Sequence, residues 1–332
     1  MTNKFYSLTP EKRLEIFAEI REINGLPLFS IEKDWWVVQT LRLIFQMDVG
    51  KHLLFKGGTS LSKAWELIER FSEDIDLALD RTFLGFAENI TRSQISKLRK
   101  ASLDYLSNTF FPELENQFLE SGFEGVELKL GEIKSIDQDP LIIEIYYPAI
   151  TENSPYVSPK MLVEIGSRSM GEPFTHRQFS SMVGEHIAGQ SFADPPIVIP
   201  CVNPERTYLE KMFLLHEEFQ RPEEKIRVNR LSRHLYDIYK ISQTDYAKIT
   251  VQDRGLFESI VSHRKHFSKM GGVDYYSHFP PNLNPMPPDN LMKLWENDYK
   301  TMQDEMIYGE SPPFEELIKS IEKTVEEINS IR

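Results

Sequence analysis

The chain has 332 residues, 40% hydrophobic and 27% charged, which excludes a disordered chain or a coiled coil and predicts about two domains. The net charge of −13 argues against a broad basic coat for nucleic acid but allows a local basic patch, and a single cysteine, Cys201, excludes an internal disulfide. Without a long apolar run or a secretory leader, the chain is expected to be a cytoplasmic protein that does not span a membrane.

The N-terminal part of the chain predicts two helices and then a strand. Residues 10–22 follow Thr9, a good N-cap, and carry apolar residues at helical spacing. Residues 30–47 repeat this spacing, with Ser30 as the candidate cap. Residues 52–55 are a short, mostly apolar run that leads into two glycines, which is typical of a buried strand entering a tight turn.

The following segments alternate between helix and strand. A helix capped by Thr59 or Ser60 is expected through about Glu69, and residues 72–79 alternate as a strand does. Prolines at 195, 196 and 200 indicate a domain junction, after which the pattern is helical. The remaining predicted elements are a largely helical stretch at 91–120, strands at 126–133, 141–147 and 160–165, and helices near 289–307 and 314–330.

The chemistry is carried by the glycine pair Gly57-Gly58 and by two aspartates, Asp74 and Asp76. Glycines let the backbone approach a ligand, and the helix N-terminus that follows attracts phosphate. Strand geometry puts both aspartates on one face, where they repel each other unless a cation lies between them. Mg²⁺ resolves this conflict and also binds nucleotide phosphates. The alternative is a solvated sheet face beside a polar turn.

A third carboxylate often completes such a metal site. Glu164 is the best candidate because it interrupts an apolar strand, where a charge is rarely buried without a partner. Glu144 has a similar setting and is the rival. For either residue, the alternative is an outward-facing position on an edge strand.

Two residues in the helical part have simpler interpretations on pattern alone. Lys211 lies beside an apolar stripe, so its ammonium group is expected to reach water unless a triphosphate is its counterion. Asp237 lies one turn after Arg233, at the spacing of an ordinary helical ion pair. A basic cluster is the best local candidate for binding a phosphate backbone, with a solvated face as the alternative; its members are Arg221, Lys225, Arg227, Arg230 and Arg233.

Taken together, these motifs resemble the AbiEii/MenT-like family of nucleotidyltransferase toxins. The core of the resemblance is the diglycine segment at 57–63 followed by the aspartate segment at 70–77. Four further segments resemble family motifs: residues 32–36 the N-terminal signature, residues 163–168 the third-carboxylate strand, and residues 204–211 and 233–237 the two helical motifs.

The resemblance implies an α+β fold, with a polymerase-β-type nucleotidyltransferase core containing a mixed sheet and a helical C-terminal region. We place these two domains at residues 1–195 and 196–332. It also implies a Mg²⁺ site, a triphosphate site and one further carboxylate that is either catalytic or an organiser of the site. The implied metal ligands are Asp74, Asp76 and Glu164, the implied nucleotide-binding residues are Gly57, Gly58, Thr59, Ser60 and Lys211, and the further carboxylate is Asp237.

The implied activity is transfer of a nucleoside monophosphate from an NTP to an acceptor, with release of pyrophosphate. The expected acceptor is tRNA, and the expected partner is a cognate antitoxin within a toxin–antitoxin or phage-defence pair. Many polymerase-β-type enzymes have serine where this chain has Gly58, so phosphate contact would fall to backbone N–H groups, Thr59 and Ser60. Two alternatives remain: a protein acceptor, which the acidic composition favours, and a catalytically silent module that binds a nucleotide or a partner.

Overall fold

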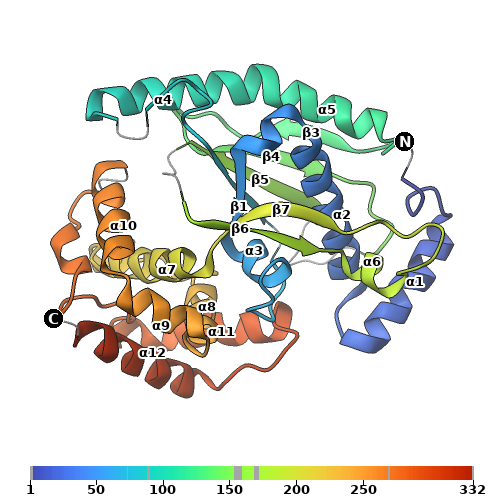
Figure 1. The fold of residues 1–332 in the computed structure, drawn as a ribbon. Helices are drawn as coiled ribbons and strands as arrows, with labels where there is room; N and C mark the ends of the chain where they lie inside the picture. Colours follow the sequence, from blue (N-terminus) through green and yellow to red (C-terminus); the bar gives the residue numbers. More distant parts are fainter. Residues whose placement is uncertain are drawn as a thin grey trace. The chain divides into compact units, whose positions relative to one another are not determined.

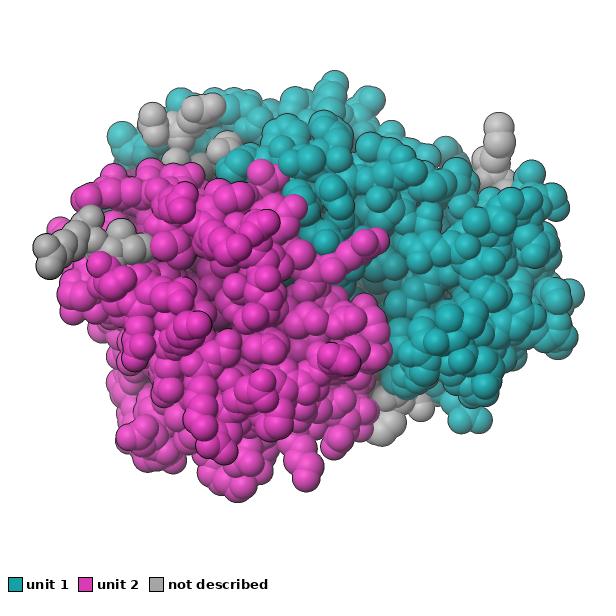
Figure 2. Space-filling model, turned by 60° about the horizontal axis from the view of Figure 1, so that its bottom comes forward, with its two compact units in different colours: residues 1–65, 71–202 teal, residues 66–70, 203–332 magenta. Residues whose placement is uncertain are grey.

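The computed structural model divides the chain into two compact units (Figure 2). It describes residues 3–72, 74–87, 90–152, 159–167, 172–267 and 270–330. Unit 1 comprises residues 1–65 and 71–202, and unit 2 comprises residues 66–70 and 203–332. These units are defined by how the chain packs, not by function. The predicted division into a nucleotidyltransferase domain at 1–195 and a helical domain at 196–332 therefore stays a prediction. In these described ranges, no helix is long and apolar enough to cross a membrane.

Unit 1 is built on a mixed sheet (Figure 1). Within the described residues the sheet has seven strands in the order β3-β4-β5-β2-β1-β7-β6. β2 pairs in parallel with β5, and β1 in parallel with β7, whereas the other neighbours are antiparallel. The strands are β1 (Leu53–Lys56), β2 (Asp74–Leu79), β3 (Glu127–Leu130), β4 (Leu141–Tyr146), β5 (Lys160–Gly166), β6 (Phe174–Phe179) and β7 (Ile197–Val202).

The alternation of side chains separates the two faces of the central strands. Phe55, Ile75, Ile143 and Val163 are fully buried and belong to the core. Their neighbours along each strand point to the opposite face and are only half buried. The strand register keeps each set in line across the sheet. One face is therefore packed, and the other presents polar groups for chemistry.

The first two helices begin differently. α1 starts as predicted, because the Thr9 side chain accepts a hydrogen bond from the Lys12 N–H. α2 starts after Pro27, so the predicted cap at Ser30 is wrong and Ser30 is buried inside the helix. The helices of unit 1 are α1 (Pro10–Asn24), α2 (Leu28–Gln46), η1 (Asp48–His52), α3 (Gly57–Lys63), α4 (Arg92–Tyr105), η2 (Leu106–Phe110), α5 (Phe111–Glu120) and α6 (Met182–His186).

Two predictions about unit 1 are corrected by the structure. α3 begins at Gly57, so Thr59 and Ser60 lie inside the helix, which also ends before Glu69. Pro200 lies within strand β7 rather than at a junction. The free energy gained by burying alternate residues of β7 outweighs the loss of the one sheet hydrogen bond that proline cannot donate. The sequence pattern does not predict β6 or β7, and for β7 the reason is Pro200, which is typical of a break in a strand.

Unit 2 is helical and includes the short segment 66–70. As predicted, its first helix starts at Pro204 with Asn203 at the N-cap. Its elements are α7 (Pro204–Phe219), η3 (Glu223–Lys225), α8 (Ser232–Ser242), α9 (Asp245–Gln252), α10 (Arg254–Phe267), η4 (Tyr275–His278), η5 (Asp289–Leu291), α11 (Met292–Glu305) and α12 (Phe314–Asn329).

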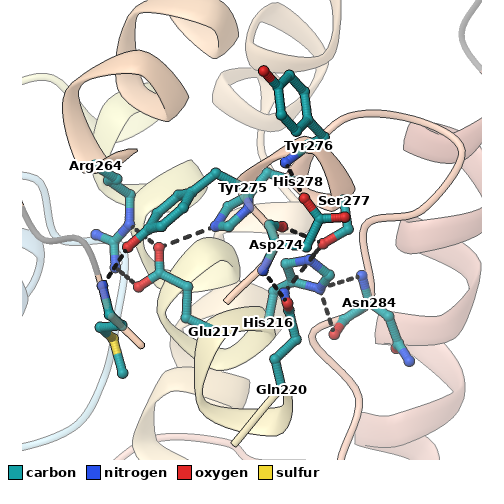
Figure 3. Close-up of polar contacts among 11 residues, drawn as sticks. His216, Glu217, Gln220, Arg264, Asp274, Tyr275, Tyr276, Ser277, His278 and Asn284 are labelled. Atoms are coloured by element: carbon teal, nitrogen blue, oxygen red, sulfur yellow. Dashed lines mark hydrogen bonds and ion pairs between the residues drawn. The ribbon is translucent and has the colours of Figure 1, made fainter. Parts of the chain in front are cut away.

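A polar network ties α7 to the loop that contains η4 (Figure 3). The Ser277 hydroxyl donates to the Asp274 carbonyl at 2.6 Å, so it accepts the hydrogen bond from His216 Nε2 at 2.9 Å. His216 Nδ1 is then the acceptor for the Asn284 N–H at 3.0 Å. Both ring nitrogens are thus satisfied in the neutral imidazole.

The next residue of α7 carries a buried ion pair in the same network. Glu217 accepts two bonds from Arg264, both at 2.6 Å, and contacts His278 at 3.0 Å. Burial by itself would raise the pKa of Glu217, but Arg264 and His278 outweigh it and lower that pKa. The loop is therefore held by charges that are shielded from water.

Unit 2 should lose stability as the pH falls, because neutral His216 is buried. Burial lowers the pKa of His216 from 6.5 to about 4. Between these values the unfolded chain binds a proton that the folded chain does not, so acid favours unfolding. The loss should reach about 3 kcal/mol by pH 4, measured by urea unfolding at a series of pH values.

Two variants separate this titration from the other acid-sensitive groups. His216→Asn removes the titrating ring, so its free energy of unfolding should vary less between pH 6.5 and 4. His266→Asn, at an exposed histidine of α10, should keep the wild-type dependence. Identical pH dependence in all three proteins would contradict the prediction.

Candidate active site

The turn between β1 and α3 brings an aspartate against the backbone. Gly57 has a φ of 77°, in the left-handed region that favours glycine. A Cβ atom at this position would lie 1.9 Å from Asp76 Oδ2. Lys56, the residue before the turn, lies opposite Asp76 in the antiparallel register of β1 and β2. Glycine is therefore required at position 57 both by its φ angle and by the carboxylate that rests on it.

The hydroxyl groups of the turn point into unit 1. Thr59 is buried and donates to the Asp74 carbonyl at 2.5 Å, with the Ser72 hydroxyl 3.0 Å away. Ser60 is also buried and faces the thiol of Cys201, whose pKa is raised to about 12 by burial. Thr59 thus fastens α3 to the start of β2. Phosphate binding by these two hydroxyls stays a prediction and requires both to turn.

The predicted carboxylates share one face of the sheet. Asp76 lies directly opposite Glu164 in the parallel register of β2 and β5, and Asp74 lies two residues earlier on the same face. Glu144 is on this face too, opposite Leu162. In the described part of the chain, however, no three His, Cys, Asp or Glu side chains form a preassembled metal cluster. Asp74, Asp76 and Glu164 are therefore aligned on one face, but they do not surround a common metal position.

Glu144 differs from Glu164 in its surroundings. Lys160 contacts Glu144 at 2.8 Å, and the Tyr146 hydroxyl donates to the same carboxylate. These two bonds, led by that from Lys160, lower the pKa of Glu144. Its charge is therefore balanced within strands β4 and β5, whereas Glu164 is the carboxylate in register with Asp76. This arrangement favours Glu164 over Glu144 as the third carboxylate.

The N-terminal signature forms buried anchors rather than a ligand site. Asp34 contacts Lys63 Nζ at 2.8 Å and accepts the Met182 N–H at 2.7 Å. Because Lys63 is the last residue of α3, Asp34 fixes the far end of the helix that begins at the diglycine turn. Glu32, also buried, accepts the N–H groups of residues 150 and 151. No local pattern in residues 32–36 indicates this positioning role, because the partners of Asp34 and Glu32 are distant in the chain.

The two predicted helical site residues of unit 2 meet in one buried cluster. Asp237 is fully buried and bonds Arg70 through both oxygens, at 2.7 and 2.8 Å. Lys211 Nζ lies 2.7 Å from the same carboxylate. Arg70 has no predicted role from sequence, because no spacing in the sequence connects residue 70 to residue 237. The helical pair expected between Arg233 and Asp237 gives way to these two longer-range partners.

The electrostatics of this cluster follow from its burial. Burial alone would raise the pKa of Asp237, but Arg70 and Lys211 outweigh it and hold that pKa well below its ordinary value. Burial lowers the pKa of Lys211, Asp237 opposes this shift, and Arg70 and Arg233 reinforce it. Asp237 is therefore the group that keeps the Lys211 ammonium charged away from water.

The short segment 66–70 belongs to unit 2 and is held within it by several contacts. Besides the Arg70 contact, Glu69 binds Lys240 at 2.6 Å, and its carbonyl accepts the Tyr308 N–H at 3.0 Å. Residue 70 precedes Asp74 by four positions. Glu73, between residues 70 and 74, lies outside the described residues. Arg168, which follows β5 in the third-carboxylate motif, also lies outside them.

The predicted basic cluster is partly neutralised within unit 2. Arg221 and Arg227 both contact buried Glu218, at 2.8 and 2.6 Å. Burial would raise the pKa of Glu218, but the two arginines outweigh it and lower that pKa. Arg230 directs its backbone N–H to Asp298 at 2.7 Å. The ion pairs of Arg221 and Arg227 weaken the cluster as a phosphate-binding patch, and contact with RNA stays a prediction.

Comparison with known proteins decides the family. A sequence profile described as "Nucleotidyl transferase AbiEii toxin, Type IV TA system" matches residues 41–325. The chain belongs to this AbiEii family. Its members are nucleotidyltransferases and the toxins of type IV toxin–antitoxin systems, so a nucleotide substrate and an antitoxin partner go with membership. The α+β fold class and the enzyme class expected from the sequence are confirmed, which sets aside the catalytically silent alternative.

Other comparisons add little to the AbiEii assignment. No curated protein matches the chain. The solved structure of JHP933 from Helicobacter pylori is similar at 13% identity and a TM-score of 0.39, covering 88% of this chain and 89% of that one. The matched residues 41–325 include every candidate site residue, but the role of each stays a prediction.

Gly57→Ala should destabilise unit 1 more than Gly25→Ala. Both glycines have a left-handed φ, 77° and 73°, so alanine strains either backbone by about 1–2 kcal/mol. At Gly25 an added Cβ meets nothing within 4 Å, whereas at Gly57 it meets Asp76. Urea unfolding of the two variants measures the difference.

A double-mutant cycle isolates the clash from the backbone strain. In an Asp76→Ala background the carboxylate is gone and only the Cβ of residue 76 remains, 3.0 Å from the added Cβ, so Gly57→Ala should cost less than in the wild type and come closer to Gly25→Ala. Equal effects of Gly57→Ala in both backgrounds would show that the carboxylate does not rest on this glycine.

Asp237→Asn should destabilise unit 2 by about 3–5 kcal/mol, because it leaves two buried cations without their carboxylate. Asp76→Asn, at a half-buried position among other carboxylates, should change the free energy of unfolding far less. Chemical unfolding compares the two. Similar small losses in both variants would contradict a positioning role for Asp237.

Proposed function

We propose that this AbiEii toxin is a Mg²⁺-dependent enzyme that transfers a nucleoside monophosphate from an NTP to tRNA and releases pyrophosphate. The observation that supports the site is the Asp76 carboxylate resting on Gly57, at the turn from β1 into α3. Asp74 and Glu164 extend this position along one sheet face. A glycine turn beside aligned carboxylates suits a triphosphate bound with a divalent cation.

The donor set fits a hard divalent cation. Asp74, Asp76 and Glu164 offer carboxylate oxygens only, at neighbouring positions of one sheet face in the register of β2 and β5. Oxygen ligands of this kind are those that Mg²⁺ prefers. When bound, Mg²⁺ would neutralise the phosphates and stabilise charge on the leaving group. The carboxylates themselves would hold the cation beside the turn at Gly57.

The reaction forms one bond and breaks one. An acceptor hydroxyl oxygen bonds to the α-phosphorus and loses its proton, while the bond from that phosphorus to the bridging oxygen breaks and pyrophosphate leaves with the electron pair. Backbone groups of Gly57 and Gly58 would approach the triphosphate. Lys211 would neutralise it, with Asp237 as the organiser that keeps this lysine protonated.

The choice of tRNA as acceptor rests on the family resemblance. The net charge of −13 favours a protein acceptor, which is the second candidate. An RNA acceptor needs a local site rather than a basic surface, so the acidity does not decide against it. With an antitoxin partner, the proposed setting is the bacterial cytoplasm and phage defence.

Incubation with α-labelled NTP, Mg²⁺ and either total RNA or total protein tests this function. Label is expected in tRNA, and a chelator should abolish it. The Asp74→Asn, Asp76→Asn double variant should lose at least about 100-fold in rate, as expected for removing groups that stabilise charge in the reaction. Label in protein alone would replace the tRNA proposal with the second candidate.

Glu144 supplies the matched control on the same sheet face. Glu164→Gln should reduce labelling about as strongly as the aspartate changes, whereas Glu144→Gln should retain it, because Glu144 already has Lys160 as its partner. Circular dichroism confirms folding of each variant. Full activity in the folded double variant, or the reverse ranking of the two glutamates, would overturn the site assignment.

A further inference from the structure

The connection between α11 and α12, residues 306–313, pairs with the segment 66–70 inside unit 2 (Figure 1). We call this connection the strap. Ile307 forms an antiparallel bridge with Arg70. The N–H groups of Tyr308 and Gly309 both donate to the Glu69 carbonyl, at 3.0 and 3.3 Å. The strap therefore lies along the segment as a neighbouring strand does.

The strap is held in place by the helix that precedes it. The Tyr299 hydroxyl donates to the Pro312 carbonyl at 3.0 Å, and the Gln303 side chain donates to the Ser311 hydroxyl at 2.9 Å. At the other end, Met306 is buried and its N–H donates to the Met302 carbonyl at 2.9 Å. Because both ends are fixed to α11, the middle of the strap cannot move away from the segment by itself.

Gly309 makes the close approach of the strap possible. A Cβ atom at this position would lie 2.4 Å from both Cβ and Cδ of Glu69, and 2.5 Å from its Oε2. Carbon atoms in contact normally lie about 3.5–4.0 Å apart. The Cβ of Glu69 is fixed by the backbone and cannot rotate away as the end of a side chain can. Space therefore requires glycine at position 309.

Helix α8 binds the side chains of the same two segment residues. Lys240 Nζ lies 2.6 Å from Glu69 Oε2, and Asp237 binds Arg70 through both of its oxygens. Asp237 and Lys240 are three residues apart and thus lie on one face of α8. The strap therefore fixes the main chain at residues 69 and 70, while α8 receives their side chains.

The position of Arg70 sets the geometry of the buried cluster. A guanidinium group that binds a carboxylate through two parallel bonds fixes the plane of that carboxylate. Asp237 also contacts Lys211, at 2.7 Å, and all three side chains are buried. A shift of Arg70 therefore changes the orientation of Asp237 and, with it, the place of the Lys211 ammonium group.

We propose that the strap positions Arg70 for nucleotidyl transfer, and that Gly309 is the positioning residue that lets it do so. The strap acts on the Asp237–Lys211 pair through Arg70 and contacts no substrate. The inference rests on the proposed function in giving Lys211 the triphosphate. The placement of Arg70 by the strap does not depend on that role.

Steady-state kinetics of Gly309→Ala test the effect on the reaction. The kcat/KM for NTP should fall about 10-fold to 100-fold, as expected when an active-site group is misplaced by about 1 Å. The KM for the acceptor should stay unchanged. Gly255→Ala on α10 is the matched control, because its added Cβ comes no closer than 3.5 Å to the Asp253 side chain, and it should keep the wild-type constants.

Two second changes at Glu69 test whether the added methyl group acts through this residue. In the Gly309→Ala background, Glu69→Gly removes every atom that the new Cβ meets and should restore most of the lost rate. Glu69→Ala keeps the Cβ at 2.4 Å and should not restore it. Both changes remove the contact with Lys240, so their difference reports the Cβ alone. If Gly309→Ala does not fold, the same ranking should appear in the recovery of folding by circular dichroism.

Urea unfolding gives a readout that needs no catalysis. Asp237→Asn should shift the unfolding midpoint less in Gly309→Ala than in the wild type, because Arg70 no longer faces the carboxylate in that background. In Gly255→Ala the shift should equal that in the wild type.

The outcomes separate this inference from the proposed function. Wild-type kinetics in folded Gly309→Ala, equal rescue by the two Glu69 changes, or additive midpoint shifts for Gly309→Ala and Asp237→Asn would each overturn the inference. If the wild type labels neither RNA nor protein, the proposed function fails, and the unfolding comparison still decides whether the strap positions Arg70.

Discussion

The candidate active site depends on a contact that only glycine permits. The Asp76 carboxylate lies where a Cβ atom of residue 57 would be, so the turn and the aspartate strand fix each other. The left-handed φ of Gly57 directs the chain from β1 into α3 while keeping the backbone open beside the carboxylate. A negative charge held against a backbone turn repels phosphate by itself. The same proximity becomes favourable once a divalent cation bridges the two.

Buried ion pairs anchor both halves of this arrangement. Asp34 holds Lys63, the last residue of the helix that starts at the turn. Asp237 holds Arg70, four residues before the first aspartate of β2, together with Lys211. Each carboxylate is shielded from water, where losing a partner leaves an uncompensated charge. Under the proposed function, Asp34 and Asp237 support the residues that bind the nucleotide rather than contact it themselves.

Much of the site could be predicted because it is local. The order of glycines, helix and alternating strand placed Asp74 and Asp76 on one face, and the apolar setting of Glu164 marked it as exceptional. The sequence preferred Glu164 and kept Glu144 as its rival, and it could not decide between them because the choice depends on which strands pair. It also missed β7, where Pro200 resembled a break although buried neighbours secure the strand.

The sequence by itself determined the alternation of the strands, the glycine turn and the family, since each depends on residues close together in the chain or on motifs in order. Only the tertiary structure decided that Thr59 points inward and that Asp237 pairs with Arg70. Those contacts join residues far apart in the chain. Their energies arise from burial and strand register, which no local pattern encodes.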